Sequence, residues 1–379
     1  MVPALAFALV VVGSAIALTF DRLWQDAAAV ELRTAGEAAA LAAACQLASD
    51  DTLKKDADWA GICQSARDVA VEIADQNFVG GVPVRLDVAK DGDVRLGQMI
   101  PNSIGEDVFV ETEDHPRTVV VRAWQGRGSR NPVGLLVRDL TGAGRLMEFL
   151  MVATAENRIE ALRPYEGVNV PALPIAICAG NVAMPGWSAL IEKQLGPDTC
   201  GWNAELKEVE QTADGLPEMT AFSVPQQADQ KQQLLATLHL IDIGAGLSDH
   251  VLAEQCRNGW SQDDLAKWDG ELPCDGRSRA FTSKPKIPAV VRSELSQLIG
   301  EVRICWLFET ALPTANSDQC QLSCARLVAV RILDVQSLPD GMFGLQVQPA
   351  VITTRTAVVS RSGDDSLANP YVYKVYLSH

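Results

Sequence analysis

The chain has 379 residues, of which 47% are hydrophobic and 21% charged, so it has enough apolar material for a core, which excludes a mainly disordered chain. Its 48 acidic and 32 basic residues give a formal net charge of −16, which would repel a phosphate backbone and argues against nucleic acid as a partner. A mean hydropathy of +0.06 is high for so acidic a chain, and it indicates that the hydrophobic residues are concentrated in one segment.

The first 20 residues form that apolar segment, and the first charged side chain is Asp21. At ~1.5 Å per residue, a helix of this length is sufficient to cross the hydrocarbon of a bilayer. Trp24 follows at the position of an interfacial aromatic belt. The segment is predicted to be a retained membrane helix. The alternative is a signal peptide cleaved after Ala17, although a basic n-region is missing and the apolar run is longer than usual.

An alanine-rich segment covers residues 27–48, with 11 Ala among 22 residues, and Ala is the best helix former. One face of it repeats at helical spacing through Ala28, Leu32, Ala35, Ala39 and Ala42. The sequence therefore predicts one continuous rod of about 45 residues that starts in the membrane and continues beyond it.

The rest of the chain alternates between helical and extended patterns, which predicts an α+β fold with a β-rich ectodomain. Helices are predicted at 59–76, 146–162, 187–195 and 289–299. Strands are predicted at 107–111, 117–124, 133–140, 234–243, 302–311, 326–335, 343–353 and 371–377. Alternation on both sides of Asp91-Gly92 predicts a β-hairpin over residues 82–96, and the polar segment 197–233 predicts a long loop.

A domain boundary is predicted near residues 163–174, where three Pro and one Gly interrupt the pattern. The chain then divides into three parts. These are the membrane anchor with its Ala-rich rod (1–48), an α/β part of the ectodomain (49–165) and a β-rich C-terminal part (166–379).

Nine cysteines are spaced mostly 15 to 22 residues from a neighbour, which predicts local loops closed by disulfides and hence an oxidising compartment. They are Cys45, Cys63, Cys178, Cys200, Cys256, Cys274, Cys305, Cys320 and Cys324. The alternative is that they are buried, reduced thiols that act as small hydrophobes. There is no C-x-x-C motif, and Cys320-x-x-x-Cys324 has no His nearby in sequence, so no zinc site is predicted.

Catalytic motifs are missing from the sequence. The chain has four His and contains no H-E-x-x-H, G-x-S-x-G or G-x-x-x-x-G-K-[ST] motif. No nucleophile and base stand at a spacing that indicates a reaction. We therefore assign no catalytic, cofactor-binding or metal-binding residue, and we expect a non-enzymatic protein.

The apolar run 4–20 continues into the Ala-rich block Val30–Ala42, and a D-V-x-L-G turn lies at Asp93–Gly97. Between them, a helical segment carries the pattern A-R…A…A…N…G at Ala66, Arg67, Ala70, Ala74, Asn77 and Gly80. In these features the first 100 or so residues resemble the TadE/TadG-like proteins of the Flp (Tad) pilus-assembly system. The C-terminal half is similar to the large-ectodomain members of planctomycete-type bacteria at 289–311, 328–335 and 345–350.

Two features of that family are missing here. The printed sequence does not show the family's short basic leader ahead of a Gly and an early Glu, so either the true start lies upstream or this member is not processed. It also contains no D-x-S-x-S motif of the von Willebrand A domain that TadG proteins often carry. The metal function of that domain is therefore not part of what the resemblance implies.

The resemblance implies a single-pass protein of the bacterial inner membrane with its ectodomain in the periplasm or outside, acting as a minor pilin-like or assembly component. Its expected partners are the membrane and other pilus-assembly or pilin-like proteins. In the membrane helix, Gly13, Ser14 and Ala17 offer a small-residue face on which another helix can pack. The alternatives are an exported envelope protein of unknown role, and a secreted enzyme or solute-binding protein released after a signal peptide.

Overall fold

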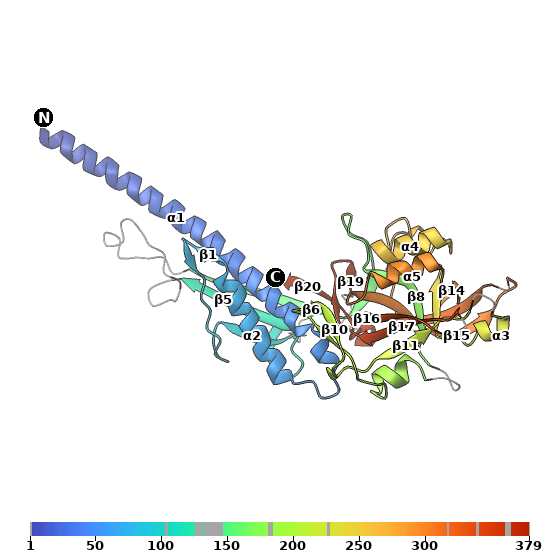
Figure 1. Ribbon diagram of the computed structural model, residues 1–379. Helices are drawn as coiled ribbons and strands as arrows, with labels where there is room; N and C mark the ends of the chain where they lie inside the picture. Colours follow the sequence, from blue (N-terminus) through green and yellow to red (C-terminus); the bar gives the residue numbers. More distant parts are fainter. Residues whose placement is uncertain are drawn as a thin grey trace. The chain divides into compact units, whose positions relative to one another are not determined.

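The computed structural model describes residues 2–102, 105–125, 131, 147–180, 185–225, 228–316, 318–338, 341–360 and 365–378. The chain forms two compact units (Figure 1). Unit 1 consists of residues 1–47, 58–155 and 375–379. Unit 2 consists of residues 48–57 and 156–374. The predicted parts 1–48 and 49–165 thus lie mainly in one unit, apart from the segments 48–57 and 156–165.

Unit 1 is built on helix α1 (Val2–Leu47), which runs for 46 residues without a break. The predicted rod of about 45 residues has this length and position. Helix α2 (Trp59–Asp75) packs beside the C-terminal half of α1. The Asp58 side chain caps α2 by accepting a hydrogen bond from Gly61 N at 3.0 Å, which satisfies one of the free amides of its first turn.

An antiparallel sheet completes unit 1 and packs on α1 through its strand β5 (Thr118–Gln125). Its other strands are β3 (Val94–Pro101), β4 (Asp107–Glu111), β6 (Met147–Glu156) and β20 (Val372–Ser378). They lie in the order β20-β6-β5-β3-β4. Along β5 the buried and half-buried residues alternate, because one face of the strand lies against the helix and the other is more open.

Two predictions for unit 1 are wrong. The hairpin centred on Asp91-Gly92 does not form, because β3 pairs with β4 and β5 rather than with residues 82–90. Instead, β1 (Phe78–Val79) and β2 (Val82–Pro83) form a short hairpin of their own. The helix predicted at 146–162 is replaced by β6 and by β7 (Ile159–Leu162), which belongs to unit 2.

A third prediction for this part of the chain, the strand at 133–140, lies outside the described residues.

Unit 2 is organised around a five-stranded barrel. The barrel strands are β8 (Ala172–Cys178), β12 (Leu238–Ile241), β14 (Arg279–Lys284), β15 (Val302–Pro313) and β16 (Cys320–Ser337). They pair in the order β16-β14-β12-β8-β15, and a further pairing of β15 with β16 closes the ring. Only the β8–β15 pair is parallel, and irregular register in β15 near Leu307 and Phe308 helps the strand to curve.

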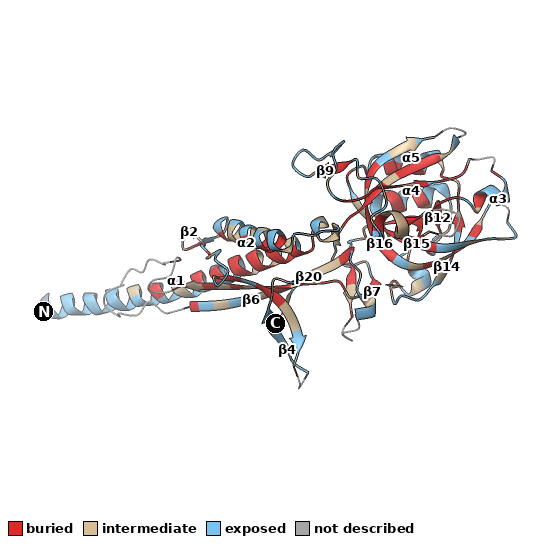
Figure 2. Cartoon of the chain, turned by 90° about the horizontal axis from the view of Figure 1, so that it is seen from below, coloured by how far each residue is buried: buried red, intermediate tan, exposed pale blue. Residues whose placement is uncertain are grey.

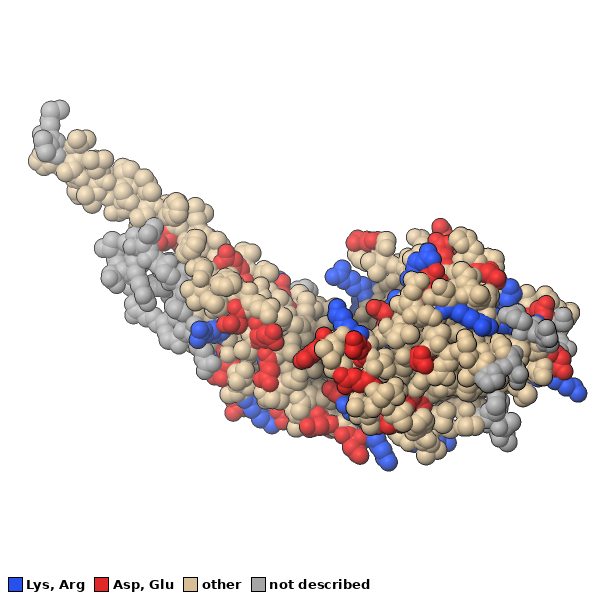
Figure 3. All heavy atoms as spheres, in the orientation of Figure 1, with Lys and Arg blue, Asp and Glu red and all other residues tan. Residues whose placement is uncertain are grey.

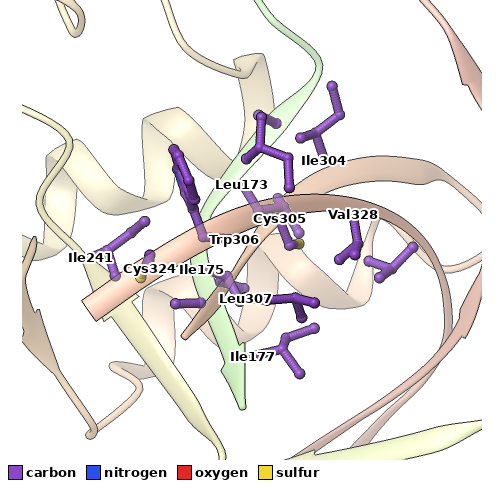
Figure 4. Packing of buried hydrophobic residues seen from close by; sticks show 14 of the residues in the cluster. Leu173, Ile175, Ile177, Ile241, Ile304, Cys305, Trp306, Leu307, Cys324 and Val328 are labelled. Carbon is purple, nitrogen blue, oxygen red and sulfur yellow. The ribbon is translucent and has the colours of Figure 1, made fainter. Parts of the chain in front are cut away.

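Helices α4 (Asp249–Asn258) and α5 (Ala289–Ser296) pack on each other (Figure 1). Helix α4 also packs on β8, and helix α5 also packs on β16. The core around the barrel contains the fully buried Trp306 and a row of branched aliphatic side chains from β8. Figure 4 shows Ile175 and Ile177 of β8 beside Leu307 of β15, which agrees with the register that places Ile177 opposite Leu307. The predicted strands at 234–243, 302–311, 326–335 and 343–353 and the helix at 289–299 supply part of this core, whereas β8, β14 and α4 were not predicted.

Shorter elements surround the barrel. Two strands extend its sheet, β17 (Phe343–Pro349) beside β16 and β11 (Met219–Phe222) beside β17. Small sheets are formed by β13 (Leu272–Pro273), β7 and β19 (Ala357–Val359), and by β9 (Gly201–Asn203) with β10 (Glu208–Glu210). β18 (Ile352–Thr353) pairs in parallel with the start of β20. Short helical segments are Asp50–Leu53, Ser188–Glu192, Gln230–Gln233, Ala266–Trp268 and Asp365–Leu367.

The predicted fold class holds at the coarse level: a long apolar N-terminal helix precedes a β-rich α+β body. Within unit 2, the predicted helix 187–195 is only a π-helical turn at Ser188–Glu192. The predicted loop 197–233 contains three short strands and one helical turn between its irregular stretches.

Candidate functional site: the exposed face of helix α1

Helix α1 changes character halfway along its length. Residues 3–20 are all exposed except Ala17, which is half-buried, and the large side chains among them include Phe7 at 71% and Ile16 at 60% exposure. Figure 2 shows this half in pale blue, with buried positions appearing only farther along the helix. In Figure 3 it carries neither acidic nor basic side chains on the face shown. By length and composition, α1 is the one helix in the described chain that can cross a membrane.

Such a surface is unfavourable in water. Burying apolar area stabilises by about 25 cal/mol per Å², and soluble proteins rarely leave a continuous apolar patch of this extent uncovered. A lone helix also satisfies all of its central backbone hydrogen bonds internally, which is the condition for residing in hydrocarbon. The exposed half of α1 is therefore suited to lipid or to other apolar helices.

The second half of α1 is shaped to pack on protein. Leu32, Ala35 and Ala39 are buried, which confirms most of the predicted face, whereas Ala42 is only half-buried. Small side chains let the sheet approach closely, and a Cβ added at Gly36 would lie 1.8 Å from the Cε atom of Met151 on β6. The tight packing fixes this half of the helix to unit 1.

The boundary between the two halves carries the first polar groups. Asp21 is buried, and Arg22 forms an exposed ion pair with Asp26, whose Oδ2 lies 3.5 Å from Arg22 Nε. Trp24 is 44% exposed just beyond them. An aromatic ring next to the first charges is typical of the place where a helix leaves the hydrocarbon.

The predicted small-residue face lies within the exposed half. Gly13 and Ser14 are exposed, Ala17 is half-buried, and a Cβ added at Gly13 would meet no atom within 4 Å. Gly13 and Ala17 are four residues apart and so share one side of the helix. Their proposed role in helix packing remains a prediction.

The cysteines do not form the predicted disulfides: all nine are free thiols. Strand register explains part of this. Cys320 and Cys324 lie on the same strand, about 13 Å apart at ~3.3 Å per residue. Cys305 stands opposite Val328, several residues from either of them. A disulfide needs Cα atoms within about 7 Å. The cysteine spacing therefore gives no support for an oxidising compartment.

Most of these thiols are buried in the cores, as in the alternative interpretation of the sequence. Burial raises the pKa of Cys256 and of Cys274 to about 12, and it also raises the pKa of Cys305. Because the thiolate is the reactive form, such thiols are poor nucleophiles. Cys45 on α1 is the one exposed cysteine of the nine.

Alkylation should therefore separate Cys45 from the other thiols. A thiol-specific reagent applied to the folded chain is expected to modify Cys45 first, and after denaturation without reductant it should modify all nine positions. Mass spectrometry of the digested protein reads out both results. Modification of fewer than nine cysteines before reduction would show that some of them form disulfides, as the sequence predicts.

Unit 2 has a cavity of about 160 Å³ lined by Trp306, Cys274 and Tyr371, among others. Its polar lining groups bond to protein: Arg326 pairs with Glu192 at 2.8 Å, and the Asn369 amide donates to Leu327 O. The cavity is smaller than the ~300 Å³ at which small-molecule sites begin. Among the described residues, no group of three or more His, Cys, Asp or Glu side chains is placed to hold a metal ion.

Comparison of the chain with protein-family models, with curated proteins and with solved structures finds no match. The functional inference therefore rests on the chain itself, and above all on α1.

Proposed function

We propose that this protein is a single-pass membrane protein of a TadE/TadG-like type that serves Tad pilus assembly as a non-enzymatic, minor pilin-like or assembly component. In this proposal, residues 3–20 of α1 lie in the bacterial inner membrane, and the rest of the chain faces the periplasm or the outside. The resemblance of the first 100 or so residues to that family supplies the pilus context.

One observation carries the proposal: α1 passes without a break from an exposed apolar half into a half that packs against unit 1. A helix continuous across this junction holds the folded part at a fixed distance from the membrane. A cleavable signal peptide does not need to be continuous with a packed helix of the mature protein. This favours a retained anchor over release after Ala17.

The proposed packing face provides the test. In the double variant Gly13→Leu/Ala17→Leu, bulky side chains prevent close approach of a neighbouring helix. We expect this variant to remain in the membrane but to lose co-purification with pilin-like subunits and to produce few surface pili by electron microscopy. Ala15→Leu is the control, because Ala15 lies on the opposite side of the helix and gains the same bulk as the Ala17→Leu half of the double variant.

The control variant should assemble pili at the level of the unchanged chain. Normal pilus numbers in a strain that lacks this protein altogether would refute the pilus role. The membrane anchor is tested separately, by cell fractionation, and would not be refuted by that result.

A further inference from the structure

Strand β4 is an open edge of the unit 1 sheet. Within the described chain it pairs with β3 alone, in a register that places Ile100 opposite Val108 and Gln98 opposite Val110. β3 itself pairs with β5 only over Val94–Gly97, so no further strand of the described residues lies beside the outer half of the β3–β4 hairpin. Figure 2 colours β4 in pale blue and tan, without buried positions.

The backbone groups that face away from β3 follow from two hydrogen bonds. Thr112 N donates to Leu96 O at 3.0 Å, and Asn102 N donates to Glu106 O at 2.7 Å. These bonds direct the even-numbered residues of β4 toward β3, because inward and outward groups alternate in an antiparallel ladder. The N–H and C=O groups of Asp107, Phe109 and Glu111 therefore point outward, where a further strand could bind them.

Several of the usual protections against strand addition are missing from this edge, and its charged residues, Asp107 and Glu111, are confined to its two ends. β4 contains no Pro, no Lys and no bulge, whereas the outer stretch of β3 ends in Pro101, which has no N–H to offer. Val108 and Val110 are 46% and 44% exposed. With Ile100, at 44%, they form an apolar strip on one face of the hairpin. The edge thus offers both hydrogen bonds and apolar contact.

Charge decides what kind of strand fits. Acidic residues stand at both ends of β4, at Asp107 and Glu111, and both are exposed. If two copies paired in antiparallel fashion about Phe109, each Asp107 would face a Glu111, and like charges directly opposite are destabilising. A second copy of this chain is therefore disfavoured, and a strand with basic residues at those positions is favoured.

We propose that β4 is a docking edge for an extended segment of a partner protein with the pattern basic–apolar–any–apolar–basic. Its backbone extends the sheet at Asp107, Phe109 and Glu111. Its apolar residues lie beside Val108 and Val110, and its basic residues pair with the two acids. This inference stands apart from the membrane role of α1 and does not depend on it.

The test uses the full chain in detergent micelles and labelled peptides containing Lys-Val-Thr-Val-Lys between Gly-Ser flanks. We expect saturable binding by fluorescence anisotropy. Binding should weaken at least about tenfold for Glu-Val-Thr-Val-Glu, and also for Lys-Val-Pro-Val-Lys, whose Pro removes the central N–H. Hydrogen exchange should slow in segment 106–111 when the first peptide binds, because the outward amides become bonded.

A charge exchange gives the sharpest comparison. The variant Asp107→Lys/Glu111→Lys should prefer the Glu peptide over the Lys peptide. Glu72→Lys/Asp75→Lys on α2 carries the same change of charge away from β4 and should leave the preference unchanged. Equal binding of all three peptides, absence of binding, or exchange protection elsewhere than 106–111 would overturn the proposal, as would a stable dimer formed through β4.

Discussion

Arginine at both Val11 and Val12 should release the chain from the membrane fraction. These residues lie at the centre of the exposed half of α1, and both are at least half exposed. Placing Arg at the middle of a membrane helix costs about 2.5–3.5 kcal/mol on insertion scales, so two of them cost about 5–7 kcal/mol. That is sufficient to reverse a strong preference for the bilayer. Carbonate extraction followed by immunoblotting of pellet and supernatant measures the outcome.

The matched control is Val11→Leu/Val12→Leu, which keeps the segment apolar and should leave the chain in the carbonate-resistant pellet. Retention of the double Arg variant in that pellet would contradict a hydrocarbon location for α1. Recovery of the unchanged chain in the soluble fraction with Leu18 as its first residue would instead establish the cleaved signal peptide.

The rod was predictable because its signals are local. Uninterrupted apolar residues, high Ala content and a repeat at Leu32, Ala35 and Ala39 all favour one helix, and no Pro or Gly pair interrupts them. α2 and most of the C-terminal strands were predictable for the same reason. In each of them the hydrophobic residues recur with a clear helical or strand period, and the packing of neighbouring elements favours the same structure.

The segment around β6 shows where local signals fail. Its Met, Glu, Leu and Ala residues are good helix formers, which is why a helix is predicted over 146–162. In the structure, Met151 and Ala153 turn inward in alternation with the half-buried Val152, because the segment pairs with β5 from Met147 to Thr154. Pairing with a strand more than 20 residues away overrides the intrinsic preference.

Barrel closure and the open edge could not be read from sequence at all. Closure depends on β15 pairing with both β8 and β16, and the parallel pairing with β8 joins segments well over 100 residues apart. Whether β4 is an edge strand depends on how many strands pair with it: β3 pairs with one side, and no strand of the described residues pairs with the other. The cysteine spacing was misleading because regular intervals along the chain say nothing about which strand, or which end of it, a thiol occupies.

His239 on β12 is a buried titratable group that no sequence motif marked. Its side chain is fully buried, and its Nδ1 lies 3.2 Å from the Oγ atom of Ser283. Its ring meets that of Phe308 edge-on, with 5.1 Å between centroids. Burial lowers the pKa of His239 from 6.5 to about 4, although the carbonyl of Ala236 acts in the opposite direction. The imidazole is therefore neutral in the folded protein at pH 7.

The sign of the pH dependence follows from linkage. Between about pH 6.5 and pH 4 the unfolded chain binds a proton at His239 and the folded chain does not, so stability rises with pH across this window. The contribution of the neutral His239 to the free energy of unfolding is fully present above pH 6.5 and is lost as the pH falls toward 4. A shift from 6.5 to about 4 corresponds to about 3 kcal/mol in the free energy of unfolding.

Replacing His239 by Gln should remove this pH-dependent contribution to the free energy of unfolding. We expect the free energy of unfolding of the unchanged chain to fall about 3 kcal/mol further between pH 7 and pH 4 than that of His239→Gln. Urea unfolding followed by tryptophan fluorescence measures it, because Trp187, Trp260 and Trp306 are buried in unit 2. The exposed His250→Gln serves as control and should follow the unchanged chain at every pH. Parallel curves for all three proteins would mean that His239 is already protonated, or accessible to water, in the folded barrel.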